Sequence, residues 1–168
     1  MQKIEIFAAG QNDMPQITAI YQEAVRNGTA SWEYDPPTIE EMQARFENII
    51  AGGFPYIAAK IGDKIVGFAY ASSYRTRIGY RFCVEDSVYV DPNFHGQGVG
   101  CQLLAALVSE CCARGFKQMI AVIGDSQNQA SIRLHEKCGF VIAGQLNKIG
   151  YKFDKWLDSI LMQRELFR

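Results

Sequence analysis

Three glycines alternate with other residues in the segment His95-Gly96-Gln97-Gly98-Val99-Gly100, at the start of a long apolar stretch. A helix that begins in such a turn leaves main-chain N–H groups without partners and carries partial positive charge there, so it holds phosphate oxygens well. The spacing excludes a P-loop, because Cys101-Gln102 follows where Lys-Ser/Thr is needed, and a dinucleotide fingerprint, which needs a small residue at Cys101. The glycines alone predict either another kind of phosphate site or a helix start without a ligand.

Three arginines form a second candidate binding group: Arg75, Arg77 and Arg81 lie within one short segment, residues 74–81. A solvated charged loop is one interpretation. The other is that the planar guanidinium groups bind a carboxylate or phosphinate through paired hydrogen bonds.

The glycines join a predicted strand to a predicted helix. The strand, Val84–Val90, has the β-branched and aromatic content of a buried strand and ends at Asp91-Pro92-Asn93. From Val99 the apolar residues follow helical spacing toward a stop at Gly115. This strand and helix therefore position the residues that could do chemistry.

The remaining sequence predicts strands and helices on both sides of this unit. The other strands are expected at 4–6, 56–61, 65–72, 118–123, 140–147 and 156–166, and the other helices at 13–27, 38–52 and 131–137. Trp32 and Tyr34 lie on the loop between the first two helices, where aromatic side chains either pack down or line a pocket. A chain of 168 residues suits one domain, 1–168.

The composition argues against several classes of partner. Lys plus Arg (17) nearly balances Asp plus Glu (18), so no attraction to nucleic acid or anionic membranes is expected. No apolar run is long enough to span a bilayer, and the first residues lack a signal peptide's apolar core, which predicts an intracellular protein. The five cysteines show no Cys-x-x-Cys and favour buried free thiols over disulfides or a metal site.

Two motifs resemble the signatures of the GNAT acyltransferase superfamily. Residues 95–100 match its Arg/Gln-x-x-Gly-x-Gly/Ala motif in the glycines, with His95 in place of the usual Arg or Gln. Its second motif, Asn-x-x-Ala/Ser-x-x-x-Tyr-x-x-x-Gly-Phe, is similar to residues 128–140, with His135 in place of the tyrosine. The resemblance implies an α/β fold: a mixed, twisted sheet of about seven strands flanked by four helices, with the fourth and fifth strands splayed apart.

Further matches narrow the resemblance to the phosphinothricin and methionine sulfoximine acetyltransferases. These are Val-Glu-x-Ser-Val-Tyr-Val at 84–90, Leu-His-Glu at 134–136 and Gly-Tyr-Lys-Phe-x-x-Trp-x-Asp at 150–158. The resemblance implies a cytoplasmic homodimer that transfers acetyl from acetyl-CoA directly to the amino group of a small amino-acid-like substrate. Alternatives are acetylation of a protein N-terminus or polyamine, and a CoA-binding sensor without turnover.

The resemblance also assigns expected roles to individual residues. Acetyl-CoA would be bound by Val88, Tyr89, Val90, Gly96, Gln97, Gly98, Val99, Gly100, Cys101, Asn128 and Ser131. The amine substrate would be bound by Trp32, Arg75, Thr76, Arg77, Glu85, Asp86, Ser87, Lys152 and Trp156. Trp156 is equally a candidate for the core.

Glu85 and His135 are the candidate catalytic residues. Amine substrates are mostly protonated at neutral pH, so a base must act before attack, and we expect Glu85 to do so directly or through water. The alternative for Glu85 is an ion pair with a nearby arginine. His135 either protonates the departing thiolate, shares the base role, or is structural. Asp86 should point to the opposite face of the sheet from Glu85.

Overall fold

The computed structural model describes residues 3–167. Its strands are β1 (Glu5–Ala8), β2 (Tyr56–Ile61), β3 (Lys64–Ser73), β4 (Cys83–Val90), β5 (Gln118–Gly124), β6 (Val141–Lys152) and β7 (Lys155–Glu165). Its α-helices are α1 (Met14–Asn27), α2 (Ile39–Ala51), α3 (Val99–Ala113) and α4 (Gln129–Lys137). Short 3₁₀ turns lie at Gln11–Asp13, Ile78–Tyr80 and Pro92–Phe94.

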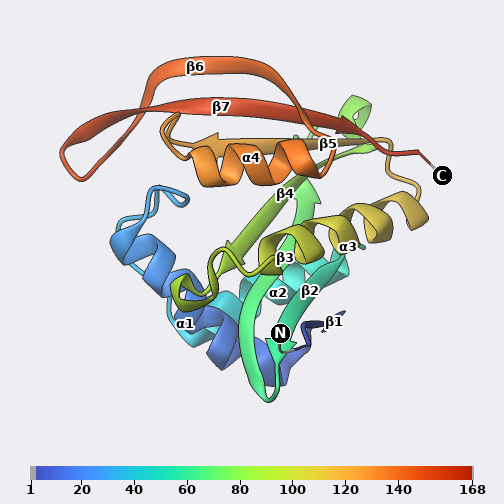
Figure 1. The fold of residues 1–168 in the computed structure, drawn as a ribbon. Coiled ribbons are helices and arrows are strands. Elements are labelled where there is room, and N and C mark those ends of the chain that lie inside the picture. Colours follow the sequence, from blue (N-terminus) through green and yellow to red (C-terminus); the bar gives the residue numbers. More distant parts are fainter. Residues whose placement is uncertain (1–2, 168) are drawn as a thin grey trace.

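The seven strands form one mixed sheet in the order β1-β2-β3-β4-β5-β7-β6 (Figure 1). Neighbouring strands are antiparallel except β4 and β5, which are parallel. The crossover between these two strands is α3, as a parallel connection requires. The structure therefore confirms the predicted mixed sheet with four helices.

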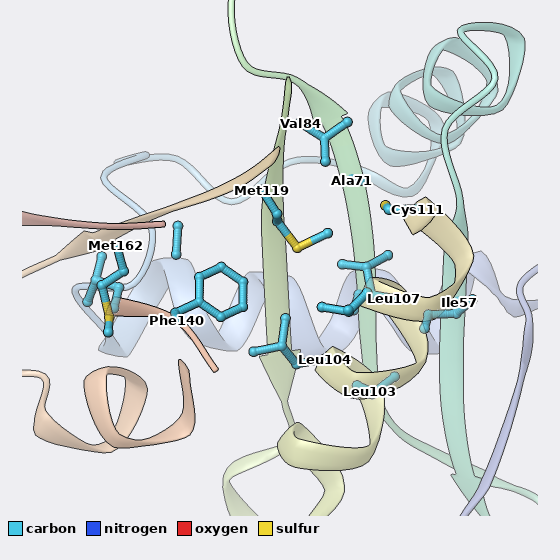
Figure 2. Packing of buried hydrophobic residues seen from close by; sticks show 14 of the residues in the cluster. Ile57, Ala71, Val84, Leu103, Leu104, Leu107, Cys111, Met119, Phe140 and Met162 are labelled. Atoms are coloured by element: carbon cyan, nitrogen blue, oxygen red, sulfur yellow. The ribbon is translucent and has the colours of Figure 1, made fainter. Parts of the chain in front are cut away.

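Two apolar clusters cover the two faces of the sheet. Alternate residues of β3 point to opposite faces, so Ala69 packs toward α3 while Phe68 packs toward α1 and α2. Figure 2 shows Leu103, Leu104 and Leu107 of α3 beside the sheet, and all three are fully buried. Each fully buried leucine contributes about 2 kcal/mol to folding. The N-terminal half of α3 is therefore held firmly against β3 and β4.

Local sequence signals define the helix starts. Thr38 accepts a hydrogen bond from the Glu41 main chain (3.2 Å), and the Glu41 side chain accepts one from Thr38 N–H (2.7 Å). This is the capping box that the sequence predicts for α2. Helix α3 starts after Gly98, whose φ of 84° lies in the left-handed region that suits glycine. The glycine turn thus allows the sharp change of direction from β4 into α3.

The long β6 differs from the prediction, which ended this strand at Asn147. The observed strand continues to Lys152 because its pairing with β7 shifts register between Leu146 and Gly150. Lys148 has a positive φ of 50° at this irregularity, and the strand then resumes. Phe153 and Asp154, both with positive φ, form the tight turn into β7. The polar residues at this bulge therefore resemble the end of a strand in the sequence.

All five cysteines are free, and Cys111 is fully buried while the others are partly buried. No helix within residues 3–167 combines the length and apolar character needed to cross a membrane. The same part of the chain holds no cluster of three or more His, Cys, Asp or Glu side chains suited to a metal ion.

Candidate active site

Strands β4 and β5 are hydrogen-bonded over a short stretch only. Their parallel pairing runs from Cys83 opposite Gln118 to Glu85 opposite Ile120. Strand β4 continues to Val90, and the two strands diverge beyond Glu85. The splay that the resemblance implies is therefore present, and it opens a gap in the middle of the sheet.

The register with β3 shows which main-chain groups face this gap. Asp91 N–H donates to the carbonyl of Val66, which is on the β3 side (2.9 Å), so odd-numbered positions of β4 bond to β3. In an antiparallel ladder, alternate residues direct their main-chain groups to opposite sides of the strand. Val88 and Val90 therefore direct their N–H and C=O groups into the gap. The Val90 carbonyl already lies 3.0 Å from His95 Nε2, and the remaining groups can pair with the amides of an extended ligand, as an added strand would.

A cavity of about 820 Å³ lies where β4 ends and α3 and α4 begin. It is lined by most of the residues predicted to bind the cofactor: Val88, Tyr89, Val90, Gly96, Gly98, Val99, Gly100, Cys101, Asn128 and Ser131. Gln97 is outside this lining, and its side chain donates to the carbonyl of Asn93 (3.3 Å). The cavity has the size of a cofactor site and ends on the N-terminus of α3, where a pyrophosphate would meet free N–H groups.

Two cations that the sequence analysis missed also line the larger cavity. Arg133 and Lys137 are one turn apart on α4, so their side chains share a face of that helix. Their i, i+4 spacing was a usable signal, but only the fold shows that this face meets the glycine turn. They give an anionic ligand a local positive charge in a chain with a net charge of −1.

A smaller cavity of about 240 Å³ adjoins the first at Val88 and Tyr89. Its lining brings together residues from three distant segments of the chain: Trp32, the consecutive Glu85, Asp86 and Ser87, and His135. Burial raises the pKa of Glu85, and the negative charge of Asp86 raises it further. A carboxylate with a raised pKa is a better proton acceptor near neutral pH than an exposed glutamate.

Trp32 is wedged against two glycines. A Cβ atom at Gly150 of β6 would lie 2.3 Å from the indole ring, and one at Gly124 of β5 would lie 2.7 Å from its Nε1 atom. Both strands must therefore have glycine at these positions for the indole to reach the cavity. The loop aromatic lines a pocket, one of the two alternatives the sequence left open.

Asp86 and His135 form a buried pair on the α4 side of β4. The His135 Nε2 atom lies 2.9 Å from Asp86 Oδ2. His135 is 4% exposed and Asp86 is 7% exposed. The other ring nitrogen, Nδ1, donates to the carbonyl of Ser131 (2.7 Å). Burial by itself lowers the pKa of His135, but the hydrogen bond and charge of Asp86, together with the Ser131 carbonyl, outweigh it and raise that pKa. The expected orientation of Asp86, opposite to Glu85, agrees with this contact.

Neither cavity is lined by five of the residues that the resemblance assigns to binding the amine substrate: Arg75, Thr76, Arg77, Lys152 and Trp156. The first three are exposed on the loop between β3 and β4. Trp156 is 64% exposed, which rules out the alternative that it belongs to the core. Among residues 3–167, no arginine or lysine lines the small cavity to meet a substrate carboxylate.

Lys152 is buried, with an exposed fraction of only 2%. Its ammonium group donates to the carbonyls of Val25 (2.7 Å), Gly28 (2.8 Å) and Ser31 (2.6 Å). Burial lowers the pKa of Lys152, against the opposing charge of Glu33. The side chain thereby ties the C-terminal end of α1 and the loop before Trp32 to the β6–β7 hairpin.

Three buried polar atoms around the small cavity have no hydrogen-bond partner among the described residues: Trp32 Nε1, Asp86 Oδ1 and Ser159 Oγ. Only one other buried side-chain atom in that part of the chain, Thr18 Oγ1, shares this property. Unpaired buried polar groups are costly and uncommon. Their concentration around one cavity is typical of a site that completes its hydrogen bonds with a ligand.

Comparison with known proteins agrees with this geometry. Residues 17–140 match the acetyltransferase (GNAT) family. The chain is 50% identical to a phosphinothricin N-acetyltransferase from Alcaligenes faecalis over 155 residues, which cover 92% of this chain and 79% of that protein. It is 42% identical to an L-methionine sulfoximine/L-methionine sulfone acetyltransferase from Pseudomonas aeruginosa, with 94% and 92% of the two chains covered.

A solved structure is similar to this chain in both fold and sequence. The crystal structure of a GNAT superfamily phosphinothricin acetyltransferase from Sinorhizobium meliloti in complex with AcCoA superposes with a TM-score of 0.94 at 44% identity. The match covers 97% of this chain and 88% of that one. With the splayed strands, the glycine turn and these relatives together, the chain belongs to the GNAT acetyltransferase family.

Proposed function

We propose that this protein is an N-acetyltransferase that moves acetyl from acetyl-CoA to the amino group of a small amino-acid-like substrate of the phosphinothricin or methionine sulfoximine type. The observation that carries the proposal is the junction of the two cavities at Val88 and Tyr89. One cavity suits an extended phosphorylated cofactor, and the other places a carboxylate of raised pKa beside it. The named activities of the relatives supply the substrate class.

The cofactor would be held mainly by main-chain groups. The N–H groups at the start of α3 would bind the pyrophosphate, with Arg133 and Lys137 adding charge. Val88 and Val90 would pair with the amides of the pantetheine arm in the gap. Asn128 accepts a hydrogen bond from Ser131 N–H (3.2 Å) as the N-cap of α4, which fixes its amide at the cavity wall.

The chemistry would use one group for each requirement of acyl transfer. Glu85 would take a proton from the substrate ammonium, which leaves a neutral amine able to attack. The N–H group of Val88, on the open edge of β4, would donate to the acetyl oxygen as negative charge develops on it. His135 would supply the proton for the departing thiolate.

The test is release of free coenzyme A thiol by the purified protein with a panel of acceptors: phosphinothricin, methionine sulfoximine and sulfone, common amino acids, polyamines and peptides. We expect the highest kcat/KM with an amino acid of the first group. Activity confined to peptides or polyamines would refute the substrate class. Binding of acetyl-CoA without thiol release from any acceptor would indicate a sensor and refute the enzyme.

We also propose a cytoplasmic homodimer. The edge of the sheet formed by β6 and β7 exposes a row of large apolar side chains: Val141, Ile142, Leu146, Ile149, Tyr151, Phe153 and Trp156. Such an apolar surface is typical of a protein contact. Free thiols at all five cysteines suit a reducing compartment. Light scattering should give twice the chain mass of 18.9 kDa, and a monomer would refute the dimer.

A further inference from the structure

We propose that Asp86 is a positioning residue of the transfer reaction, which acts through His135 by keeping a shared proton at the edge of the β4–β5 gap for the departing coenzyme A thiolate. The inference rests on the proposed acetyl transfer and assigns Asp86 to the leaving group instead of to the amine. It starts from the contact between the two side chains, which are 49 positions apart in the chain.

The hydrogen bonds of His135 determine where its protons lie. The Ser131 carbonyl can only accept, so the Nδ1 atom of His135 must carry a proton. The Nε2 atom faces Asp86 Oδ2, and that contact holds a second proton between a nitrogen and a carboxylate oxygen. The pair is therefore neutral overall while it holds this proton, and it bears a negative charge after losing it.

The position of Asp86 brings this proton to the gap. Glu85 is the last residue of β4 that lies opposite β5, so Asp86 is the first residue beyond the point where the strands separate. Its second oxygen, Oδ1, is buried without a partner among residues 3–167, and Asp86 lines the cavity that meets the cofactor site. Val88, whose N–H is directed into the gap, is two residues further along the same face.

The other groups around the pair do not compete for its proton. From α3, Cys111 has a pKa raised to about 12 by burial, and burial also raises the pKa of Cys138 at the end of α4. The ring of Phe140 meets the imidazole edge to face at 5.0 Å. Glu85 lies on the opposite face of β4, without a hydrogen bond to the pair, and is coupled to it through the charge of Asp86, which raises the pKa of Glu85. Asp86 is therefore the group that sets the protonation of His135.

The proposed step is balanced. The neutral amine forms a bond to the acetyl carbon, the bond between that carbon and sulfur breaks with its electron pair going to sulfur, and the proton shared by His135 and Asp86 passes to that sulfur. The nitrogen, positively charged after attack, loses its second proton to solvent to give the neutral amide. The pair is left as neutral imidazole and carboxylate. Solvent then returns one proton to the pair, so that of the two protons the nitrogen loses, one is in effect transferred to coenzyme A and one is released.

The test compares the wild type with Asp86→Asn, and with Asp154→Asn on the exposed β6–β7 turn as a control. The chain has only two histidines, so ¹⁵N-histidine labelling lets NMR follow the His135 ring as pH is raised. In the wild type, His135 should stay protonated to a higher pH than a free histidine side chain, whose pKa is about 6.5. In Asp86→Asn it should titrate about 1 pH unit or more lower, because an amide cannot supply the negative charge.

The kinetic measurement uses pH profiles of kcat. We expect the alkaline limb of Asp86→Asn to move down in pH by the same amount as the ring titration, with the KM for acetyl-CoA changed less than about twofold. If the pKa of the His135 ring falls in Asp86→Asn while the alkaline limb of the kcat profile does not move, the role in transfer is refuted. A ring titration that does not move would refute the control of protonation by Asp86.

Two further measurements keep the inference testable. If Asp86→Asn does not fold, the wild-type titration decides alone, since a His135 ring whose pKa lies below that of a free histidine side chain, about 6.5, refutes the shared proton. The NMR experiment needs no turnover. Absence of thiol release by the wild type would refute the proposed function, whereas a displaced ring titration with an unchanged kinetic limb refutes only this inference.

Discussion

Replacing Lys152 by methionine should weaken the whole region around Trp32. The ammonium group of Lys152 donates three hydrogen bonds of 2.6 to 2.8 Å, to carbonyls of Val25, Gly28 and Ser31. Methionine is similar in length and fills the same space, but it donates none of them. The variant therefore tests the hydrogen bonds with little change in packing.

The expected loss follows from the groups left behind. Each buried carbonyl without a partner costs about 1 to 3 kcal/mol, and the bonds to Val25 and Ser31 are fully buried. The loss is offset in part because the variant no longer buries an ammonium ion. We expect a net loss of about 3 kcal/mol in the free energy of unfolding. For a chain of this size, that lowers Tm by about 6 to 12 °C.

Thermal unfolding by circular dichroism measures the stability change, with Lys155→Met as the matched control. Lys155 lies opposite Lys152 in the β6–β7 hairpin but is exposed, so its replacement should leave Tm nearly unchanged. Since the loop before Trp32 loses its anchor, the KM for the amine should rise about fivefold or more, with the KM for acetyl-CoA within about twofold. A Lys152→Met protein that melts within 2 °C of the control would refute the reasoning.

Two further predictions concern the carboxylate and the cations of the site. Glu85→Gln should lower kcat by about 10² to 10⁴ with little change in acetyl-CoA affinity by calorimetry, and an unchanged kcat would exclude Glu85 as the base. A carboxyl whose pKa is higher in the folded state stabilises the protein below its unfolded pKa, and this contribution is lost as pH rises through the folded pKa. The Tm of Glu85→Gln minus the Tm of the wild type should therefore be more positive at pH 8 than at pH 4. The double variant Arg133→Ala, Lys137→Ala should raise the KM for acetyl-CoA about tenfold at low salt and less at 1 M salt, where charges are screened. Lys117→Ala, also exposed but outside both cavities, should leave that KM unchanged, and a similar rise there would remove the cavity cations as the cause.

The parts of the structure that were predictable from sequence are those written in local patterns. The glycine turn, the apolar period of α3 and the capping box at Thr38 all act within a few residues, and all three are present. Alternation along β4 also gave the correct opposite orientations of Glu85 and Asp86. The family resemblance then supplied the splay of β4 and β5, for which no local pattern exists.

Other parts depend on contacts across the fold. His135 is a partner of Asp86 only because α4, packed against α3 and β5, brings it to the open edge of β4. Lys152 is buried only because β6 continues past a bulge to reach the end of α1. A lysine in a polar motif predicts an exposed or ligand-binding side chain, and here three main-chain carbonyls satisfy it internally. The expected substrate contacts of Arg75 and Arg77 remain predictions, since both side chains are exposed and outside the cavities.

The meeting of the two cavities at Val88 and Tyr89 has a consequence for the order of chemical events. The amine and the thioester would reach the same point from separate spaces, so each can be present while the other binds. No cysteine lines the smaller cavity, and direct attack needs both ligands together. Initial rates measured at several fixed amine concentrations should therefore give intersecting double-reciprocal lines, the pattern of a ternary complex, whereas parallel lines would reveal an acetylated enzyme.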